Sequence, residues 1–179
     1  MRWAWSCVLL GVCLFVVAPA VVVRAQSVTA PATVGVYFTP QDHPGDEVVR
    51  AFSDARRQIL VVIYEFTESH IADALVDAAR RGVDVWVIMD RSATRERGSQ
   101  YMRVADALGG HVRLHAGLDG ASGIVHNKFA VVDGRQVLTG SFNWTYSAED
   151  RNWENLVVID SPALAGAYVR QFHRIWQAP

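Results

Sequence analysis

Hydrophobic and polar positions alternate along the chain in a way that predicts strands and helices in turn. Short apolar runs predict strands at 32–38, 59–64, 83–89, 111–114 and 156–159. Between the first four runs, apolar residues repeat at helical spacing, as they do at Ile71, Ala74, Leu75 and Ala78. A strand–helix alternation of this kind predicts an α/β fold with a mixed, largely parallel sheet and helices packed on both faces.

The pattern changes after Gly123, where two apolar runs surround a turn signal. The runs at 124–132 and 137–142 predict strands, and Asp133-Gly134-Arg135-Gln136 between them is typical of a β-hairpin. A two-residue turn is the commonest connection in such a hairpin. The turn can fall at Gly134-Arg135 or at Asp133-Gly134, and the two choices differ by two residues in register.

The hairpin brings polar side chains onto one face in either register. Side chains alternate along a strand, so His126 shares a face with Lys128, and Ser141 shares a face with Asn143. With the turn at Gly134-Arg135, Lys128 lies opposite Ser141 and His126 lies opposite Asn143. Such a patch suits phosphate chemistry, because an ammonium and an amide can hold non-bridging oxygens while an imidazole attacks or moves protons.

The first residues have the pattern of an export signal. Arg2 is followed by a nearly uncharged apolar run and then by Val23-Arg24-Ala25, which has small or apolar residues where signal peptidases cut. We expect 1–25 to be a signal peptide and 26–179 to form a single domain, periplasmic or secreted. An uncleaved membrane anchor is the alternative, because the run is near the length that spans a bilayer. Contact with a membrane is expected only in that case.

Composition narrows the chemistry of the processed chain. Both cysteines, Cys7 and Cys13, fall inside 1–25, so the remaining domain can form neither a disulfide nor a cysteine-based zinc site. Arg2 and Arg24 leave with the same segment, which takes the net charge from −1 to about −3. The net charge of the processed chain therefore cannot hold nucleic acid, and any affinity for nucleic acid must come from a local basic patch.

Lysine is used once in the chain, at Lys128, among 17 lysine and arginine residues. A lysine ammonium is a compact point charge, whereas an arginine is a planar fork. His126, Lys128 and Asp133 have a His-x-Lys spacing with an aspartate five residues later, which seldom arises by chance. Asp133 is thereby a candidate catalytic residue, although its place at the turn and its opposite parity favour a structural role.

The segment from His126 to Asp133, followed by Gly140-Ser141-Phe142-Asn143, resembles the HKD signature of the phospholipase D superfamily. The resemblance covers nearly the whole chain after residue 25 and is closest to small bacterial endonucleases with a single motif. Tyr64-Glu65-Phe66-Thr67 and Trp153-Glu154-Asn155 match in place and order. The resemblance implies a phospholipase D-like α/β sandwich and a metal-independent phosphodiesterase that uses no cofactor.

The resemblance also implies roles for the residues of the motif. His126 is expected to be the nucleophile that becomes a phosphohistidine. Lys128 and Asn143 are expected to bind the substrate phosphate, with Ser141 assisting. Glu154 matches a family glutamate that hydrogen-bonds the imidazole and fixes its tautomer and orientation, and it counts with His126 and Lys128 as catalytic.

One motif is half of what this chemistry needs. The family's double displacement uses one histidine as nucleophile and another to protonate the leaving oxygen and then activate water. No histidine other than His126 is followed two residues later by lysine. The resemblance therefore implies a homodimer with a composite site formed by two-fold pairing.

DNA or RNA is the expected substrate. The alternatives are a hydrolase of phosphatidyl lipids such as cardiolipin and a non-catalytic nucleic-acid-binding module.

Two further groups of residues bear on nucleic-acid binding. The first is a cationic cluster that follows the carboxyl end of a predicted parallel strand and consists of Arg91, Arg95, Arg97 and Arg103. The cluster can form a groove for a polynucleotide backbone, since α/β sheets bind ligands at such ends, or it can be a solvated surface. The second group, Trp144 and Tyr146, can stack on bases or pack in the core.

Overall fold

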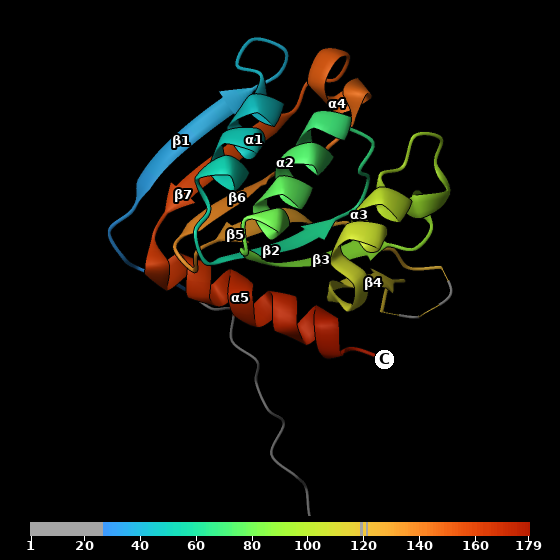
Figure 1. Cartoon of the computed structure of the whole chain (residues 1–179). Helices are drawn as coiled ribbons and strands as arrows, with labels where there is room; N and C mark the ends of the chain where they lie inside the picture. Colours follow the sequence, from blue (N-terminus) through green and yellow to red (C-terminus); the bar gives the residue numbers. More distant parts are fainter. Residues whose placement is uncertain (1–26, 119, 121) are drawn as a thin grey trace, which may run out of the picture.

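A computed structural model describes residues 27–118, 120 and 122–179, and within them a seven-stranded sheet lies between helices (Figure 1). The strands are β1 (Thr33–Phe38), β2 (Gln58–Ile63), β3 (Asp84–Asp90), β4 (Val112–His115), β5 (Lys128–Val132), β6 (Gln136–Gly140) and β7 (Asn155–Asp160). The helices are α1 (Pro44–Asp54), α2 (Ser69–Arg80), α3 (Tyr101–Leu108), α4 (Tyr146–Asp150) and α5 (Pro162–Gln177). The expected signal peptide lies outside the described residues, and none of the helices within them is long and apolar enough to cross a membrane.

The strand directions confirm a mixed α/β sheet, whose order is β1-β7-β6-β5-β2-β3-β4. β1, β2, β3, β4 and β6 run in one direction, and β5 and β7 run in the other. Among the seven strands, β2–β3 and β3–β4 are the parallel pairs, and helices connect the strands of each pair. The other pairs are antiparallel, because β5 and β6 form a hairpin, β7 returns beside β6, and β1 pairs with β7 at the far edge.

Apolar side chains at alternate positions of the same strands form two cores, one on each face of the sheet. In β2, Val61 packs toward α1 and α2, whereas Leu60 and Val62 pack toward α5. α5 crosses β2, β5 and β6 and contributes Phe172 to its core. Burial on both faces is the reason why β2 is apolar from Ile59 to Ile63. The expected helices on both faces of the sheet are confirmed.

The β5–β6 hairpin is present, but its loop is longer than the sequence predicts. Val132 pairs with Gln136, so the loop holds three residues, Asp133–Arg135. Asp133 and Gly134 both adopt positive φ, at 55° and 65°. Aspartate tolerates this left-handed conformation better than most residues, and here its carboxylate also accepts hydrogen bonds from the backbone of 56–58.

The extra loop residue offsets the pairing by one position from both predicted registers. Lys128 therefore comes level with Gly140, and the predicted pairing of Lys128 with Ser141 is wrong. β5 also begins at Lys128 and not at residue 124, so His126 precedes the strand. His126, Ser141 and Asn143 all lie beyond strand ends, where the alternation of faces no longer applies, and loop contacts place them instead.

Candidate active site

The candidate site lies at one end of the sheet, where β1, β2, β3 and β6 end and β5 and β7 begin. This border of strand ends is the edge that carries the site, as distinct from the edge strands β1 and β4. Ile63 at the end of β2 pairs with Lys128 at the start of β5. Phe38 at the end of β1 pairs with Asn155 at the start of β7. The loops at this edge therefore bring together segments that are far apart in the sequence, as expected for a ligand site of an α/β sheet.

Lys128 is a buried cation at the start of β5, with 9% of its surface exposed. Its Nζ donates a hydrogen bond to the carbonyl oxygen of His126 at 3.0 Å and lies 5.1 Å from the centre of the Tyr64 ring. Burial lowers the pKa of Lys128, while the negative charges of Glu65 and Glu154 act in the opposite direction. The ammonium has three N–H donors, so it is held in place with capacity left to bind an anion.

The imidazole of His126 is exposed and stands just before β5. Its ring packs on that of Tyr64, with the ring centres 4.9 Å apart and the planes at 60°. In the part of the chain that the structure describes, neither ring nitrogen of His126 has a hydrogen-bond partner. The ring is thus oriented by contact with Tyr64, and its nitrogens remain accessible to a substrate.

Glu154 holds the end of β6, and not the imidazole of its own chain. Its carboxylate accepts hydrogen bonds from Ser141 Oγ at 2.5 Å and from Asn152 Nδ2 at 3.1 Å. Ser141 Oγ in turn accepts from the backbone and side-chain amides of Asn155, at 3.1 and 3.2 Å. Both carboxylate oxygens of Glu154 are therefore engaged, and the expected hydrogen bond to His126 is not formed within this chain.

Asn143 joins the segment after β6 to the segment after β2. Its Oδ1 accepts a hydrogen bond from the backbone N–H of Glu65 at 3.4 Å, and the N–H of Trp144 donates to the carbonyl oxygen of Glu65 at 3.1 Å. The amide NH2 of Asn143 makes no hydrogen bond to the described residues. It is a free donor on the same edge as Lys128, which suits the expected contact with a phosphate oxygen.

Tyr64 supports both chemical groups and was missed as a site residue by the sequence interpretation. It contacts the imidazole of His126 and lies beneath the ammonium of Lys128. Burial raises the pKa of the Tyr64 hydroxyl, and so do the negative charges of Glu65, Asp90 and Glu96. The phenol therefore stays neutral at neutral pH. Its position directly after the buried run of β2 is the sequence signal that could have identified it.

Two further buried polar residues at this edge also went unnoticed in the sequence. Thr39 is fully buried after β1, where its hydroxyl donates to the carbonyl of Asn152 and accepts from the N–H of Glu154, both at 2.7 Å. Asp90 ends β3 and accepts from the N–H of Val125 at 2.7 Å. Both follow or end a strand at this edge, but only the strand order shows that these ends meet.

Asp133 lies at the other end of β5, about 16 Å from Lys128 along the strand. Its carboxylate accepts hydrogen bonds from the backbone N–H groups of Arg56, Arg57 and Gln58 at 3.0, 2.7 and 3.0 Å. Burial acts to raise the pKa of Asp133, but these hydrogen bonds and the charge of Arg57 outweigh it, and the pKa is lowered. Asp133 thus fastens the hairpin loop to β2, as its parity suggested, and takes no part in the site.

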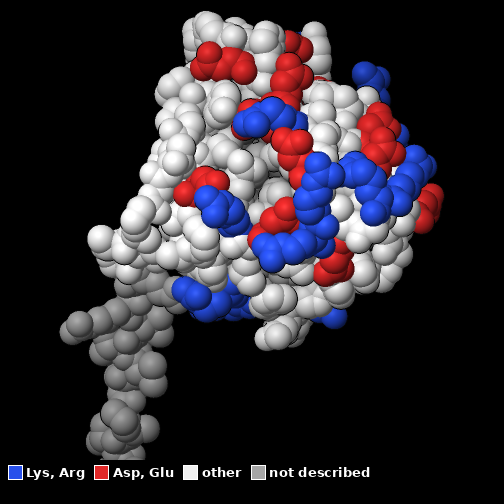
Figure 2. Space-filling view, turned by 60° about the vertical axis from the view of Figure 1, so that its left-hand side comes forward, with Lys and Arg blue, Asp and Glu red and all other residues white. Residues whose placement is uncertain are grey.

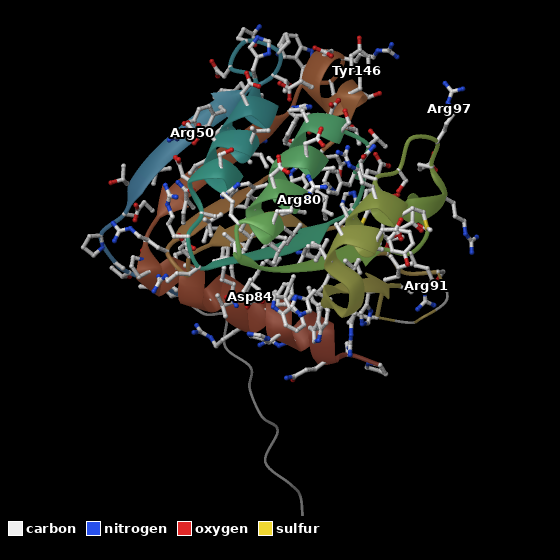
Figure 3. All side chains as sticks on the ribbon, viewed as in Figure 1. Arg50, Arg80, Asp84, Arg91, Arg97 and Tyr146 are labelled. Carbon is white, nitrogen blue, oxygen red and sulfur yellow. The ribbon has the colours of Figure 1, made fainter. Side chains whose placement is uncertain are left out.

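The cationic cluster does not form one groove. Arg103 pairs with Asp73 of α2. Arg91, Arg95 and Arg97 are exposed on the loop after β3, and Figure 3 shows Arg91 and Arg97 pointing into solvent from separate points of that loop. On the face drawn in Figure 2, several basic side chains adjoin one another in a band toward the right-hand side, with acidic side chains along its borders. The cluster reduces to exposed arginines on one loop.

The aromatic residues beyond Asn143 separate into one core residue and one surface residue. Trp144 is 2% exposed and packs edge-on against Phe66, with ring centres 5.0 Å apart, so it is not available for base stacking. Tyr146 is 55% exposed. Trp153, which directly precedes Glu154, is 85% exposed and is the most open aromatic side chain near the site.

The edge offers an accessible imidazole, a fixed ammonium and a free amide NH2 on an open surface. A pocket lies elsewhere, between α5 and the first residues of β2 and β3, with Trp86, Phe172 and Trp176 in its walls. The described residues contain no group of three or more His, Cys, Asp or Glu that could hold a metal ion. The fold is an α/β sandwich, and these groups are of the kinds that can bind and attack a phosphate ester.

Sequence comparison identifies the family. Residues 48–176 match the model of the PLD-like domain of cardiolipin synthase, and the chain belongs to the phospholipase D superfamily. It is 34% identical over 139 residues to a phospholipase D of Rickettsia bellii, covering 78% of this chain and 67% of that protein. It is 41% identical over 123 residues to the mitochondrial cardiolipin hydrolase of Xenopus laevis, covering 69% and 56%. The chain thus spans about two thirds of the first relative and little over half of the second.

Solved structures confirm the fold. Nuc of Salmonella typhimurium, a phospholipase D family member, superposes with a TM-score of 0.73 at 32% identity, covering 83% of this chain and 96% of Nuc. NucT of Helicobacter pylori superposes with a TM-score of 0.76 at 24% identity, covering 83% and 98%. The phospholipase D-like α/β sandwich expected from the sequence is therefore confirmed, and this chain is a phosphodiesterase-family protein.

Proposed function

We propose that this protein is a metal-independent phosphodiesterase that cleaves DNA or RNA through a phosphohistidine intermediate. The observation that carries the proposal is the pairing of the exposed imidazole of His126 with the buried ammonium of Lys128 on the Tyr64 ring. An accessible nitrogen nucleophile beside a fixed positive charge is what attack on a phosphodiester requires.

The proposed reaction has two steps, and each residue of the site has its own role in them. A nitrogen of His126 attacks phosphorus, and the bond from phosphorus to the leaving oxygen breaks while a second histidine protonates that oxygen. The second histidine then removes a proton from water, whose oxygen attacks phosphorus and breaks the phosphorus–nitrogen bond. Lys128 and the amide NH2 of Asn143 hold the non-bridging oxygens during both steps. Ser141 assists from the end of β6, where Glu154 holds it.

Two surface features favour nucleic acid over lipid as the substrate. The indole of Trp153 is 85% exposed beside Glu154, and a base can stack on such a ring. Arg91, Arg95 and Arg97 are exposed on the loop after β3 and can contact backbone phosphates. The names of the relatives, phospholipase D and cardiolipin hydrolase, make a phosphatidyl lipid the competing substrate.

A second copy of this chain would supply the second histidine. β1 is an edge strand, and Val34, Val36 and Phe38 are 54%, 50% and 54% exposed on the side of the sheet where α5 packs on β2, β5 and β6. By register, Val157 and Ile159 of β7 lie on this same face. We call these five residues the β1–β7 face. Phe38 pairs with Asn155 next to the site, so two-fold pairing over this face would bury apolar surface beside the chemistry.

The test compares three substrates with and without excess chelator. Purified protein is incubated with plasmid DNA, RNA and cardiolipin-containing vesicles, and His126→Ala serves as the matched inactive variant. We expect nucleic acid to be cleaved at the same rate with chelator, vesicles to stay intact, and His126→Ala to show no turnover. Activity abolished by chelator and restored by magnesium would overturn the mechanism, and hydrolysis of vesicles alone would overturn the substrate class.

A further inference from the structure

Asp90 is a buried carboxylate that the proposed chemistry does not use. It ends β3 at the edge that carries the site, and 1% of its surface is exposed. A charge in such a place is costly unless hydrogen bonds compensate it. The hydrogen bonds of Asp90 therefore show which segments this carboxylate holds in place.

The two oxygens of Asp90 bind two different segments. Oδ1 accepts hydrogen bonds from the backbone N–H of Ser92 at 2.8 Å, from Ser92 Oγ at 2.5 Å and from the N–H of Ala93 at 3.2 Å. Oδ2 accepts from the N–H of Val125 at 2.7 Å. One carboxylate thus links a residue far along the chain to the start of the loop that carries Arg91, Arg95 and Arg97. We call this loop the arginine loop.

Val125 directly precedes His126, so its hydrogen bond to Asp90 also restrains the backbone next to His126. The side chain of Val125 is 6% exposed and belongs to the core beneath α5, although the strand β5 begins only at Lys128. The backbone that carries the imidazole is therefore fixed on one side by the ladder of β5 and on the other by Asp90. Misplacing a reacting group by about 1 Å can cost about 100-fold in rate.

We propose that Asp90 is a positioning residue that holds His126 through the backbone of Val125 and, with its other oxygen, links this segment to the loop of Arg91, Arg95 and Arg97. The proposal rests on the proposed function for its kinetic consequence. The two sets of hydrogen bonds that Asp90 makes, which we call the Asp90 clamp, can be tested without any substrate.

Asp90→Asn separates the two ends of the clamp. An amide has one oxygen and one NH2, and the oxygen will face Ser92 and Ala93, which offer three donors, leaving the NH2 against the N–H of Val125. We expect kcat to fall between about 10- and 100-fold with KM unchanged, because the imidazole loses its placement. We expect amide hydrogen exchange at Val125 to accelerate, while tryptic cleavage of the arginine loop stays at the wild-type rate.

Two variants complete the experiment. Asp90→Ala releases both segments, so kcat should fall and tryptic cleavage after Arg91, Arg95 or Arg97 should accelerate as well. Asp106→Asn, on the exposed side of α3, removes a carboxylate without touching either segment and should change none of these quantities. A wild-type kcat in folded Asp90→Asn, or a fall in stability without any change in kcat, would overturn the positioning role.

Exchange in the wild type decides the matter if Asp90→Asn does not fold. The Val125 amide should then be protected like the amides of β5, and exchange as fast as that of exposed loop residues would overturn the clamp. If the wild type cleaves no phosphodiester at all, the proposed function fails. In that case the exchange and proteolysis results still support or overturn the clamp by themselves.

Discussion

At the scale of single residues, the site depends on one cation in a poorly hydrated position. Lys128 is buried under the loops of the edge and lies over Tyr64, and burial lowers its pKa. Glu65 and Glu154 oppose this shift, so the charge state of Lys128 depends on neighbours that do not touch it directly. A lysine kept charged in this way can bind a phosphate oxygen as a point charge.

Lys128→Arg should therefore be severely impaired although it keeps the charge. A planar guanidinium cannot occupy the place of a compact ammonium between the His126 carbonyl and the Tyr64 ring. We expect kcat/KM to fall about 100-fold or more, as when a group that stabilises the transition state is lost. The measurement is steady-state cleavage of a short labelled substrate, with Arg80→Lys at an exposed position of α2 as the control. Near-normal rates in Lys128→Arg would remove Lys128 from the phosphate.

The pH dependence should respond to Glu154. Activity needs protonated Lys128, so kcat/KM should fall on the alkaline side, at a lower pH than the ordinary lysine pKa because burial lowers the pKa of Lys128. The negative charge of Glu154 raises that pKa, so Glu154→Gln should lower it further and move the alkaline limb to lower pH. Profiles of kcat/KM against pH for Glu154→Gln and for the control Asp106→Asn measure this shift. An unmoved or upward-shifted limb in Glu154→Gln would contradict the electrostatic argument.

At the residue scale, the sequence predicted that the motif residues gather at one end of the sheet, but it did not identify the residues that other strands bring there. The hairpin brings Lys128 and Asn143 to the same end of the sheet, as their spacing predicted, but loop contacts to Glu65 fix where Asn143 lies. Asp90 ends β3, whereas Tyr64 and Thr39 follow β2 and β1, and only the sheet order shows that these strand ends meet. The hydrogen bond expected between Glu154 and His126 came from the resemblance, and the contacts of Glu154 within one chain go elsewhere.

At the scale of elements, the existence and order of the strands and helices followed the apolar periodicity, but the bounds of the two hairpin strands and the geometry of their loop did not. The existence of the β5–β6 hairpin was predictable, because two apolar runs flank a turn signal. Its three-residue loop was not, because Asp133 accepts three backbone N–H groups from 56–58 and can therefore hold a positive φ beside Gly134. That long-range anchor is invisible in the local sequence, and it changes the register by one residue.

The close contact of β6 with β7 makes Gly140 indispensable. A Cβ atom built there would lie 2.1 Å from the carbonyl oxygen of Asn155, which is backbone and cannot rotate away. Gly140→Ala should lower the free energy of unfolding by about 3 kcal/mol, as overpacking does. The control is Gly166→Ala in α5, where the nearest atom lies 3.5 Å away and the helix should gain about 0.5–1 kcal/mol. Urea denaturation measures both, and equal stabilities would contradict this packing.

At the scale of the whole molecule, the β1–β7 face is the surface that a second copy would cover. Val36→Lys on this face should leave the monomer folded, because the side chain is half exposed, and should shift the protein from dimer to monomer with loss of turnover. Met102→Lys, at a 65% exposed position on α3, is the matched control and should stay dimeric. Analytical ultracentrifugation measures the masses. A dimer that survives Val36→Lys would place the interface elsewhere, and a wild-type monomer with full activity would exclude a composite site.

Mixed dimers test the composite site directly. The proposed double displacement would use one His126 as nucleophile and the other as acid and base, and each chain carries one motif. Wild type and His126→Ala are refolded together at varied ratios, so that homodimers and mixed dimers form statistically. If a site needs both histidines, mixed dimers are inactive and activity falls as the square of the wild-type fraction. Independent sites would give a straight line instead, because each wild-type chain would keep its full rate. A substrate whose leaving group needs no protonation should let a mixed dimer form the phosphohistidine and then stall, which gives a stoichiometric burst without turnover.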